Sequence, residues 1–306
     1  MNRVSAQERI FMSTKKNERF MRLVRRVHGL LENEDMQRQR QAQNQLGNLM
    51  KNDKNYTFLS DDMNSMHGEW TKYVHGKQDE TIIFYCHGGG YMSGSTLYAR
   101  SVTTKLAKYT LHDVFSFDYH LAPEYPYPYA LEDALTAWNY ILSKGFHAEN
   151  IIIAGDSAGG NLALVLTLKL MELNFSLPKC LILFSPWTDM TASGNSYHTK
   201  AELDPVLNTE YIKKAIQYYL HDTNPELPYV SPLFADFSGF PPVYIQVGEN
   251  EILLDDSMML YKQLMACNVY TKMNLFEGMW HVFQMAPIRS ARDAMQKVNE
   301  FLSHLS

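Results

Sequence analysis

The stretch Ile151-Ile152-Ile153-Ala154-Gly155-Asp156-Ser157-Ala158-Gly159-Gly160-Asn161 decides the fold of this chain. An apolar β-branched run leads into a Gly-x-Ser-x-Gly sequence, and a helix-like apolar run follows at 162–166. A buried strand, a tight turn and a helix in this order are the setting of a nucleophile elbow, which lifts a serine hydroxyl to the end of a sheet. Glycine on either side of the serine keeps Cβ atoms away from the place where strand and helix nearly touch. Because a bare Gly-x-Ser-x-Gly also arises by chance, a glycine-rich turn without chemistry is the alternative.

Length and composition limit the class of protein. The chain has 306 residues, 45% apolar and 20% charged, enough for one large α/β domain with an attached lid or for two ordinary domains. Its formal net charge of −5 argues against a nucleic-acid partner or an anionic membrane surface. The three cysteines lack C-x-x-C spacing, so we expect reduced thiols and no metal site. No secretory signal and no long apolar run occurs, which predicts a cytoplasmic protein without a membrane span.

Strand-like and helix-like patterns alternate along the chain after about residue 56. Two segments, 56–59 and 69–74, alternate as edge or antiparallel strands do. The predicted buried strands are 81–86, 114–119, 151–154, 179–184, 243–247 and 269–276, and the predicted helices are 98–110, 130–144, the one after the serine, 209–220, 255–267 and 287–304. Short connections between them predict a mainly parallel sheet with helices on both faces. The less regular segment at 190–232 is interpreted as an insertion that covers the sheet edge.

The first 52 residues differ in composition from the rest. They are rich in Gln, Asn, Arg, Lys and Met. Their apolar residues are spaced as in helices, namely Ile10, Phe11, Phe20, Leu23, Val24, Val27, Leu30 and Leu31. The segment is too polar for a core, so we predict helices laid over another part of the molecule. A solvated N-terminal extension is the alternative.

Gly88 and Gly89, which follow the predicted strand 81–86, are candidates for the second part of a catalytic site. Ester hydrolysis by serine needs a base, an acid that orients the base, and N–H donors for the tetrahedral oxyanion. Gly88 and Gly89 directly follow the predicted strand 81–86, and their backbone N–H groups can turn toward Ser157. With the Ala158 N–H they would form a three-donor oxyanion hole. A merely flexible glycine turn is the alternative.

Seven motifs identify a resemblance to a known family. They are His87–Tyr91, Asp118–Glu124, Gly155–Asn161, Ser185–Asp189, Ser231–Asp236, Val247–Asp256 and Met279–Phe283. They resemble the bacterial hormone-sensitive-lipase family of α/β hydrolases, and the resemblance covers about residues 56–304 in the family's order. The resemblance implies the α/β-hydrolase fold and a carboxylesterase that uses neither a metal nor an organic cofactor. It also implies a helical cap, formed by residues 1–52 and an insertion at 188–230, over a catalytic domain at 53–306, and a possible homodimer.

The same resemblance supplies the base and the acid. His281 lies in the loop after the last predicted strand, where the family has its catalytic histidine. The chain departs from the family at the acid, because Glu251 stands where an aspartate is usual. Glutamate can do the same work, since orienting the imidazole needs only a carboxylate of suitable reach. Asp255 and Glu249 are rivals, although Asp255 is better interpreted as the N-cap of the next helix.

Other polar residues of these motifs have structural roles in this interpretation. Asp156 and Glu124 match family positions that hold the elbow region by hydrogen bonds. We expect His87 to stiffen the glycine loop and to take no part in proton transfer.

The substrate and two aromatic residues stay open. Tyr91 and Trp187 either line an acyl or alcohol pocket or pack in the core. We expect hydrolysis of short-chain acyl esters of small molecules through an acyl-enzyme intermediate. An amidase or formamidase with the same triad is the alternative. A binding protein that has lost catalysis is a third possibility, against which the presence of Ser157, Glu251 and His281 argues.

Overall fold

A nine-stranded sheet forms the centre of the molecule. The structure is a computed structural model, and it describes residues 6–10, 14–31, 35–48, 53–63, 65–77 and 80–305. The strand order is β1-β9-β8-β7-β6-β4-β5-β3-β2. The strands are β1 (Ala6–Ile10), β2 (Tyr56–Ser60), β3 (Gly68–Tyr73), β4 (Ile82–Cys86), β5 (Asp113–Phe117), β6 (Ile151–Asp156), β7 (Cys180–Phe184), β8 (Val243–Gly248) and β9 (Thr271–Phe276). Among the described strands, β2 with β3 and β3 with β5 pair antiparallel and the other neighbours pair in parallel, so the predicted mainly parallel sheet is confirmed.

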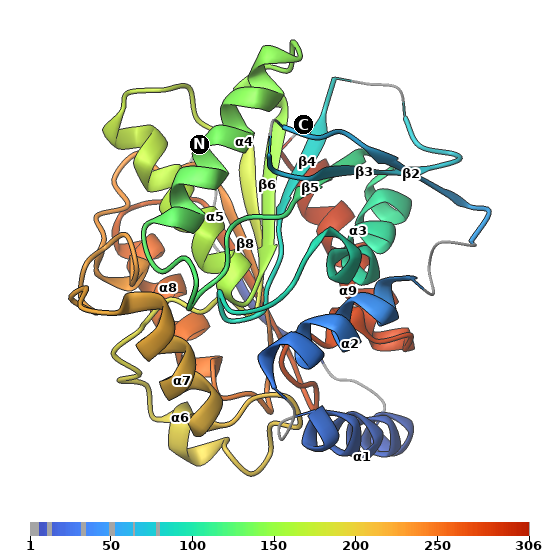
Figure 1. The fold of residues 1–306 in the computed structure, drawn as a ribbon, viewed down its shortest axis with the longest axis vertical. Helices are drawn as coiled ribbons and strands as arrows, with labels where there is room; N and C mark the ends of the chain where they lie inside the picture. Colours follow the sequence, from blue (N-terminus) through green and yellow to red (C-terminus); the bar gives the residue numbers. More distant parts are fainter. Residues whose placement is uncertain are drawn as a thin grey trace.

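Helices cover both faces of this sheet (Figure 1). The helices are α1 (Thr14–Leu31), α2 (Met36–Asn48), α3 (Thr96–Thr110), α4 (Tyr129–Ser143), α5 (Ala158–Glu172), α6 (Ser196–Thr199), α7 (Thr209–Leu220), α8 (Leu254–Ala266) and α9 (Arg289–Ser303). Apolar side chains of α4, α5 and α8 share one buried cluster, and those of α3 and α9 share another on the opposite face. The alternating strands and helices predicted from sequence are therefore present as an α/β-hydrolase-like arrangement.

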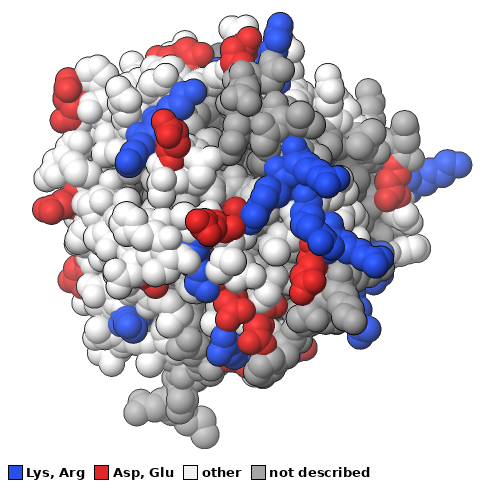
Figure 2. Space-filling model, turned by 90° about the horizontal axis from the view of Figure 1, so that it is seen from below, with Lys and Arg blue, Asp and Glu red and all other residues white. Residues whose placement is uncertain are grey.

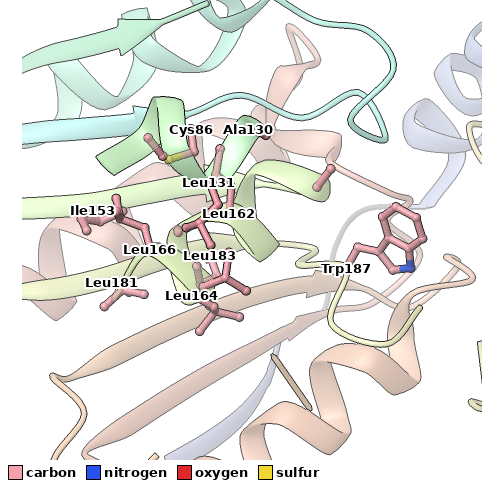
Figure 3. Packing of buried hydrophobic residues seen from close by; sticks show 14 of the residues in the cluster. Cys86, Ala130, Leu131, Ile153, Leu162, Leu164, Leu166, Leu181, Leu183 and Trp187 are labelled. Carbon is pink, nitrogen blue, oxygen red and sulfur yellow. The ribbon is translucent and has the colours of Figure 1, made fainter. Parts of the chain in front are cut away.

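The apolar run of β6 is explained by burial on both faces. Ile151 and Ile153 enter the cluster beneath α5, whereas Ile152 and Ala154 enter the cluster beneath α3 and α9. This division follows from the two-residue period of a strand. Figure 3 shows leucines of α5 beside Ile153 and beside leucines of β7. Because each large aliphatic side chain contributes about 1.5–3 kcal/mol when buried, this packing fixes α5 against the sheet.

The prediction of helices alone for the N-terminal segment is wrong at its start. Ala6–Ile10 form β1, which pairs in parallel with β9 and extends the sheet at its edge. The helical spacing of its apolar residues gave a wrong prediction because the backbone hydrogen bonds of β1 are made with β9, which is distant in sequence. Local periodicity carries no information about such a partner. The helices α1 and α2 follow as predicted. Phe11 and residues 32–34 lie outside the described residues, as do the side chains of Val27, Leu30 and Leu31.

Both N-terminal helices pack against loops at the carboxyl ends of strands. The ring of Phe20 in α1 stacks on Trp280, in the loop after β9, with centroids 5.9 Å apart. Arg40 in α2 donates from Nε to the carbonyl of Met92, in the loop after β4, over 2.7 Å. Its guanidinium also forms a bidentate ion pair with the carboxylate of Glu124. Figure 1 places α6 and α7, from the insertion, at this same end of the molecule.

Cysteines and membrane-spanning potential complete the description. All three cysteines are free thiols, and Cys86 and Cys180 are buried inside strands. Burial raises the pKa of the Cys180 thiol to about 12. Of the helices that the structure describes, none combines the length and the apolar composition needed to cross a membrane.

Strand β4 and the first turn of α5 approach each other more closely than side chains allow. A Cβ at Gly159 would lie 2.1 Å from the carbonyl oxygen of Cys86 and 2.4 Å from that of His87. A Cβ at Gly155 would lie 2.3 Å from the carbonyl oxygen of Gly159. Glycine is required at both positions by this backbone contact.

We therefore expect Gly159→Ala to push α5 away from β4 and to lower the free energy of unfolding by about 3 kcal/mol, measured by urea denaturation. The matched control is Gly145→Ala. An added Cβ there meets nothing within 4 Å, so only the left-handed backbone, φ 96°, costs about 1–2 kcal/mol. A smaller loss for Gly159→Ala than for Gly145→Ala would show that the helix can shift freely.

Candidate active site

Ser157 occupies the strained turn between β6 and α5. Its backbone has φ 53° and ψ −120°, a conformation that costs a non-glycine residue about 1–3 kcal/mol. Three hydrogen bonds hold it: its N–H donates to Phe184 over 2.9 Å, and its carbonyl accepts from Trp187 and Asn161, each over 3.1 Å. The residue is 8% exposed and stands at the N-terminus of α5, where the helix dipole favours negative charge. The turn thus has the geometry of a nucleophile elbow.

The structure brings His281 and Glu251 together. His281 Nδ1 lies 3.2 Å from Glu251 Oε1, and both side chains are buried. The other carboxylate oxygen, Oε2, accepts from the Ser185 hydroxyl and from the Gly248 N–H, each over 2.8 Å. An Nδ1–H that donates to this carboxylate leaves Nε2 of the imidazole as the atom that can accept a proton.

Three carboxylates act on the pKa of His281. Burial alone would lower the pKa of the imidazole, but the hydrogen bond and charge of Glu251, with the charges of Asp204 and Asp156, outweigh it and raise the pKa. Asp204 comes from the insertion, and the sequence interpretation assigned it no role. Nothing local marks it, because its electrostatic effect on the histidine arises from folding of the insertion against the loop after β8.

The two rival acids are engaged elsewhere. Asp255 lies in the first turn of α8, where its Oδ2 accepts from the Ser196 N–H over 2.9 Å. Its interpretation as an N-cap is wrong, because the helix already begins at Leu254 and Asp255 binds the insertion instead. Glu249 forms an ion pair with Arg9 of β1. Within the described residues, neither rival is hydrogen-bonded to His281.

In the glycine loop after β4, the N–H of Gly88 is not free to act as the oxyanion donor that the sequence predicted. The Gly88 N–H donates to Asp156 Oδ1 over 2.9 Å, so the prediction that it faces an oxyanion is wrong. A buried carboxylate takes this donor because its charge needs hydrogen bonds. The N–H groups of Gly89 and Gly90 have no acceptor among the described residues. The Ala158 N–H is the first of α5 and has no acceptor within the helix.

Tyr91, which the sequence left as either a pocket-lining or a core residue, packs in the core. Tyr91 is fully buried, its ring stacks on Tyr219 of α7 at 3.7 Å, and its hydroxyl donates to Asn161 Oδ1 over 2.7 Å. The Asn161 amide in turn donates to the carbonyls of Trp187 and Val230, each over 2.8 Å. Asn161 therefore joins the glycine loop, the loop after β7 and the end of the insertion. The sequence interpretation quoted this residue within the elbow motif but gave it no role.

Trp187 and Tyr211 lie near the elbow. Trp187 is 1% exposed, and Figure 3 shows its ring beyond the aliphatic cluster of α5 and β7. Its role in lining a pocket stays a prediction. Tyr211 of α7 lies over the glycine loop, because a Cβ at Gly90 would be 2.8 Å from its hydroxyl oxygen. Among the described residues, no group of His, Cys, Asp and Glu side chains could hold a metal ion.

Known proteins with similar sequences and structures are hydrolases. A family model described as alpha/beta hydrolase fold matches residues 83–285. An esterase of Acinetobacter venetianus is 40% identical over 227 residues, which cover 73% of this chain and 75% of that protein. An acetyl-hydrolase of Streptomyces hygroscopicus is 32% identical over 70% of this chain and 71% of its own. The crystal structure of an esterase from the bacterial hormone-sensitive lipase family superposes with a TM-score of 0.89 at 31% identity, covering 95% of this chain and 98% of the other.

The buried Asp156 carboxyl makes a testable contribution to stability. Burial raises its pKa from 3.8 to about 6, although hydrogen bonds from Tyr85 and Gly88 act in the opposite direction. The folded protein therefore holds this proton more tightly than the unfolded chain does. The resulting stabilisation is complete below about pH 4, is lost as the pH rises through 6, and amounts to about 3 kcal/mol.

We expect Asp156→Asn to remove this fall in the free energy of unfolding between pH 4 and about pH 6.5, measured by urea denaturation at each pH. The matched control is Asp222→Asn, which removes the same charge from an exposed site. Equal pH dependence in Asp156→Asn and wild type would contradict the raised pKa.

Proposed function

The chain belongs to the hormone-sensitive-lipase-like α/β hydrolases and is a serine hydrolase of carboxylic esters, and from this premise we propose that it cleaves short-chain acyl esters of small molecules through an acyl-enzyme intermediate. The observation that carries the proposal is the buried His281–Glu251 pair at the sheet end that bears Ser157. In this proposal the three residues form the catalytic triad.

The proposed reaction has two halves. His281 Nε2 takes the proton of the Ser157 hydroxyl as Oγ attacks the ester carbonyl, and Glu251 stabilises the imidazolium that forms. Collapse of the tetrahedral intermediate breaks the bond to the alkoxy oxygen, and the imidazolium gives its proton to the departing alcohol. Water, deprotonated by the same imidazole, then attacks the acyl-enzyme. Its attack releases the carboxylic acid and returns the proton to Ser157.

Three backbone N–H groups are the proposed oxyanion donors. Gly89 and Gly90 supply two, because Gly88 is committed to Asp156, and Ala158 supplies the third at the N-terminus of α5. Donors of this kind act on charge that develops only in the transition state, and each contributes about 3–4 kcal/mol. The proposal thus shifts the expected donor set by one residue along the glycine loop.

We also propose that residues 1–52 and 188–230 act as the cap over this site. Its support is the position of Tyr211 over Gly90, the stacking of Tyr219 on Tyr91, and the contact of α1 with Trp280. Bulky rings beside the glycine loop favour a small acyl group. The similarity to an acetyl-hydrolase supports the same substrate class.

The triad predicts a specific effect of changing the acid. We expect Glu251→Gln to lower kcat for nitrophenyl acetate by about 10⁴-fold while the protein stays folded, because an amide no longer stabilises the imidazolium. Asp255→Asn is the matched control and should keep most of the activity, since Asp255 binds Ser196. Near-normal turnover in Glu251→Gln would transfer the acid role to Asp255.

Covalent labelling separates catalysis from simple binding. A fluorophosphonate probe should attach to Ser157, as shown by mass spectrometry, and Ser157→Ala should abolish labelling. A folded protein that resists the probe would indicate a binding protein on this scaffold.

Acyl length separates an esterase for short chains from its alternatives. We expect kcat/KM to be highest for nitrophenyl esters of about two to six acyl carbons and to fall for longer chains, because rings around the glycine loop limit the acyl site. The corresponding anilides should react far more slowly. Anilide cleavage at rates comparable to the esters would favour an amidase.

A further inference from the structure

A buried carboxylate from the insertion holds the loop that carries Glu251. Asp204 lies between α6 and α7 and is 6% exposed. Its Oδ2 accepts from the N–H of Ile252, the residue after Glu251, over 3.0 Å. Resting on the proposed roles of His281 and Glu251, we propose that Asp204 is a positioning residue, which fixes the Glu251 loop and adds a second negative charge for the imidazolium.

The position of Asp204 is itself fixed by its own turn. Its Oδ1 accepts from the N–H groups of Val206 over 2.9 Å and Leu207 over 3.1 Å. A carboxylate with donors on both oxygens has one defined orientation. The bond to Ile252 is thus made by a rigid group, so it can hold the loop in place.

Two residues of the insertion form hydrogen bonds with the backbone of Ile252, one with its N–H and one with its carbonyl. Asp204 accepts from the Ile252 N–H, and the Ser196 hydroxyl donates to the Ile252 carbonyl over 2.6 Å. Since Ile252 directly follows Glu251, these two bonds determine where the carboxylate of Glu251 meets His281. The insertion therefore contributes to the catalytic machinery as well as covering it.

Asp204 also acts on His281 through its charge. Three described carboxylates act on His281 from three elements: Glu251 from the loop after β8, Asp204 from the insertion, and Asp156 from the end of β6. Charges in a buried site interact more strongly than charges in water. In the proposed reaction the imidazole becomes positive in the transition state, so the Asp204 charge lowers the barrier in addition to that of Glu251.

Helix α1 supports the same turn from outside. Arg25 donates from Nη2 to the carbonyls of Glu202 over 2.7 Å and Leu203 over 3.1 Å, immediately before Asp204. Figure 2 shows Lys and Arg side chains gathered on part of the face that bears α1 in Figure 1. Phe20 of α1 also stacks on Trp280, which precedes His281. One helix thus contacts both the Asp204 turn and the histidine loop.

The test is Asp204→Asn, assayed for nitrophenyl acetate hydrolysis across pH. Asparagine keeps the shape but loses the charge and one oxygen acceptor. We expect kcat to fall by about 10- to 100-fold, because the Glu251 loop loses an anchor. Burial raises the pKa of Asp204 to about 6, so its charge is present above that pH. We therefore also expect the acidic limb of the kcat/KM profile to move to lower pH in Asp204→Asn, since His281 loses this negative neighbour.

Three further variants separate these effects. Asp204→Ser retains an oxygen acceptor for the turn but not the charge, and it should reproduce both changes if Asp204→Asn does not fold. Ser196→Ala removes the hydrogen bond to the Ile252 carbonyl without changing charge. The acidic limb of its kcat/KM profile should therefore stay at the wild-type pH. Asp222→Asn, an exposed charge change in the same insertion, should match wild type in kcat and in the acidic limb.

The proposal is wrong if the folded Asp204 variants keep kcat within about twofold of wild type. If kcat falls while the acidic limb stays fixed, the electrostatic role of Asp204 is wrong, because Asp204 would then act on the Glu251 loop only through its hydrogen bond to Ile252. Fluorophosphonate labelling of wild-type Ser157 distinguishes this failure from failure of the proposed function. A labelled wild type with unaffected Asp204 variants overturns the positioning role alone.

Discussion

The strained backbone of Ser157 is the constraint on which the rest of the site depends. A serine at φ 53° stays there only because β7, the loop after it and α5 each supply a hydrogen bond. The turn is tight because Gly159 allows α5 to touch the carbonyls at the end of β4. That contact also sets the glycine loop beside the helix N-terminus. One packing arrangement therefore places a hydroxyl, a helix dipole and N–H donors that lack an acceptor among the described residues at the same end of the sheet.

Buried carboxylates organise the groups around this turn. Asp156 accepts from Gly88 and so directs which glycines of the loop remain available. Glu251 is held by Ser185 and Gly248 while its other oxygen faces His281. Burial of a charge is costly unless donors surround it, and here the donors that satisfy each carboxylate are also the segments that need positioning. Electrostatic stabilisation of the imidazole and mechanical support of the loops thus come from the same side chains.

The expectations that failed at β1 and Gly88, and the absence of any expectation for Asp204, share a physical cause. β1 lies in a segment with helical spacing, yet pairing with β9 near the other end of the chain makes it a strand. Gly88 follows a strand as expected, but the Asp156 carboxylate takes its N–H. Asp204 has no recognisable local pattern, since its importance depends on a contact with Ile252. Each outcome depends on a partner distant in sequence, which periodicity and motif spacing do not specify.

The sequence by itself determined the order of the main strands and helices after residue 56 and the elbow around Ser157, and it favoured Glu251 over Asp255 and Glu249 as the partner of His281. These features follow from local periodicity, from glycine at points of close approach, and from the resemblance of the motifs. Only the tertiary structure decided which N–H groups are free, how Asn161 joins three loops, and how the insertion reaches the acid loop. The reason is that donors and acceptors are assigned by competition among all groups that folding brings together.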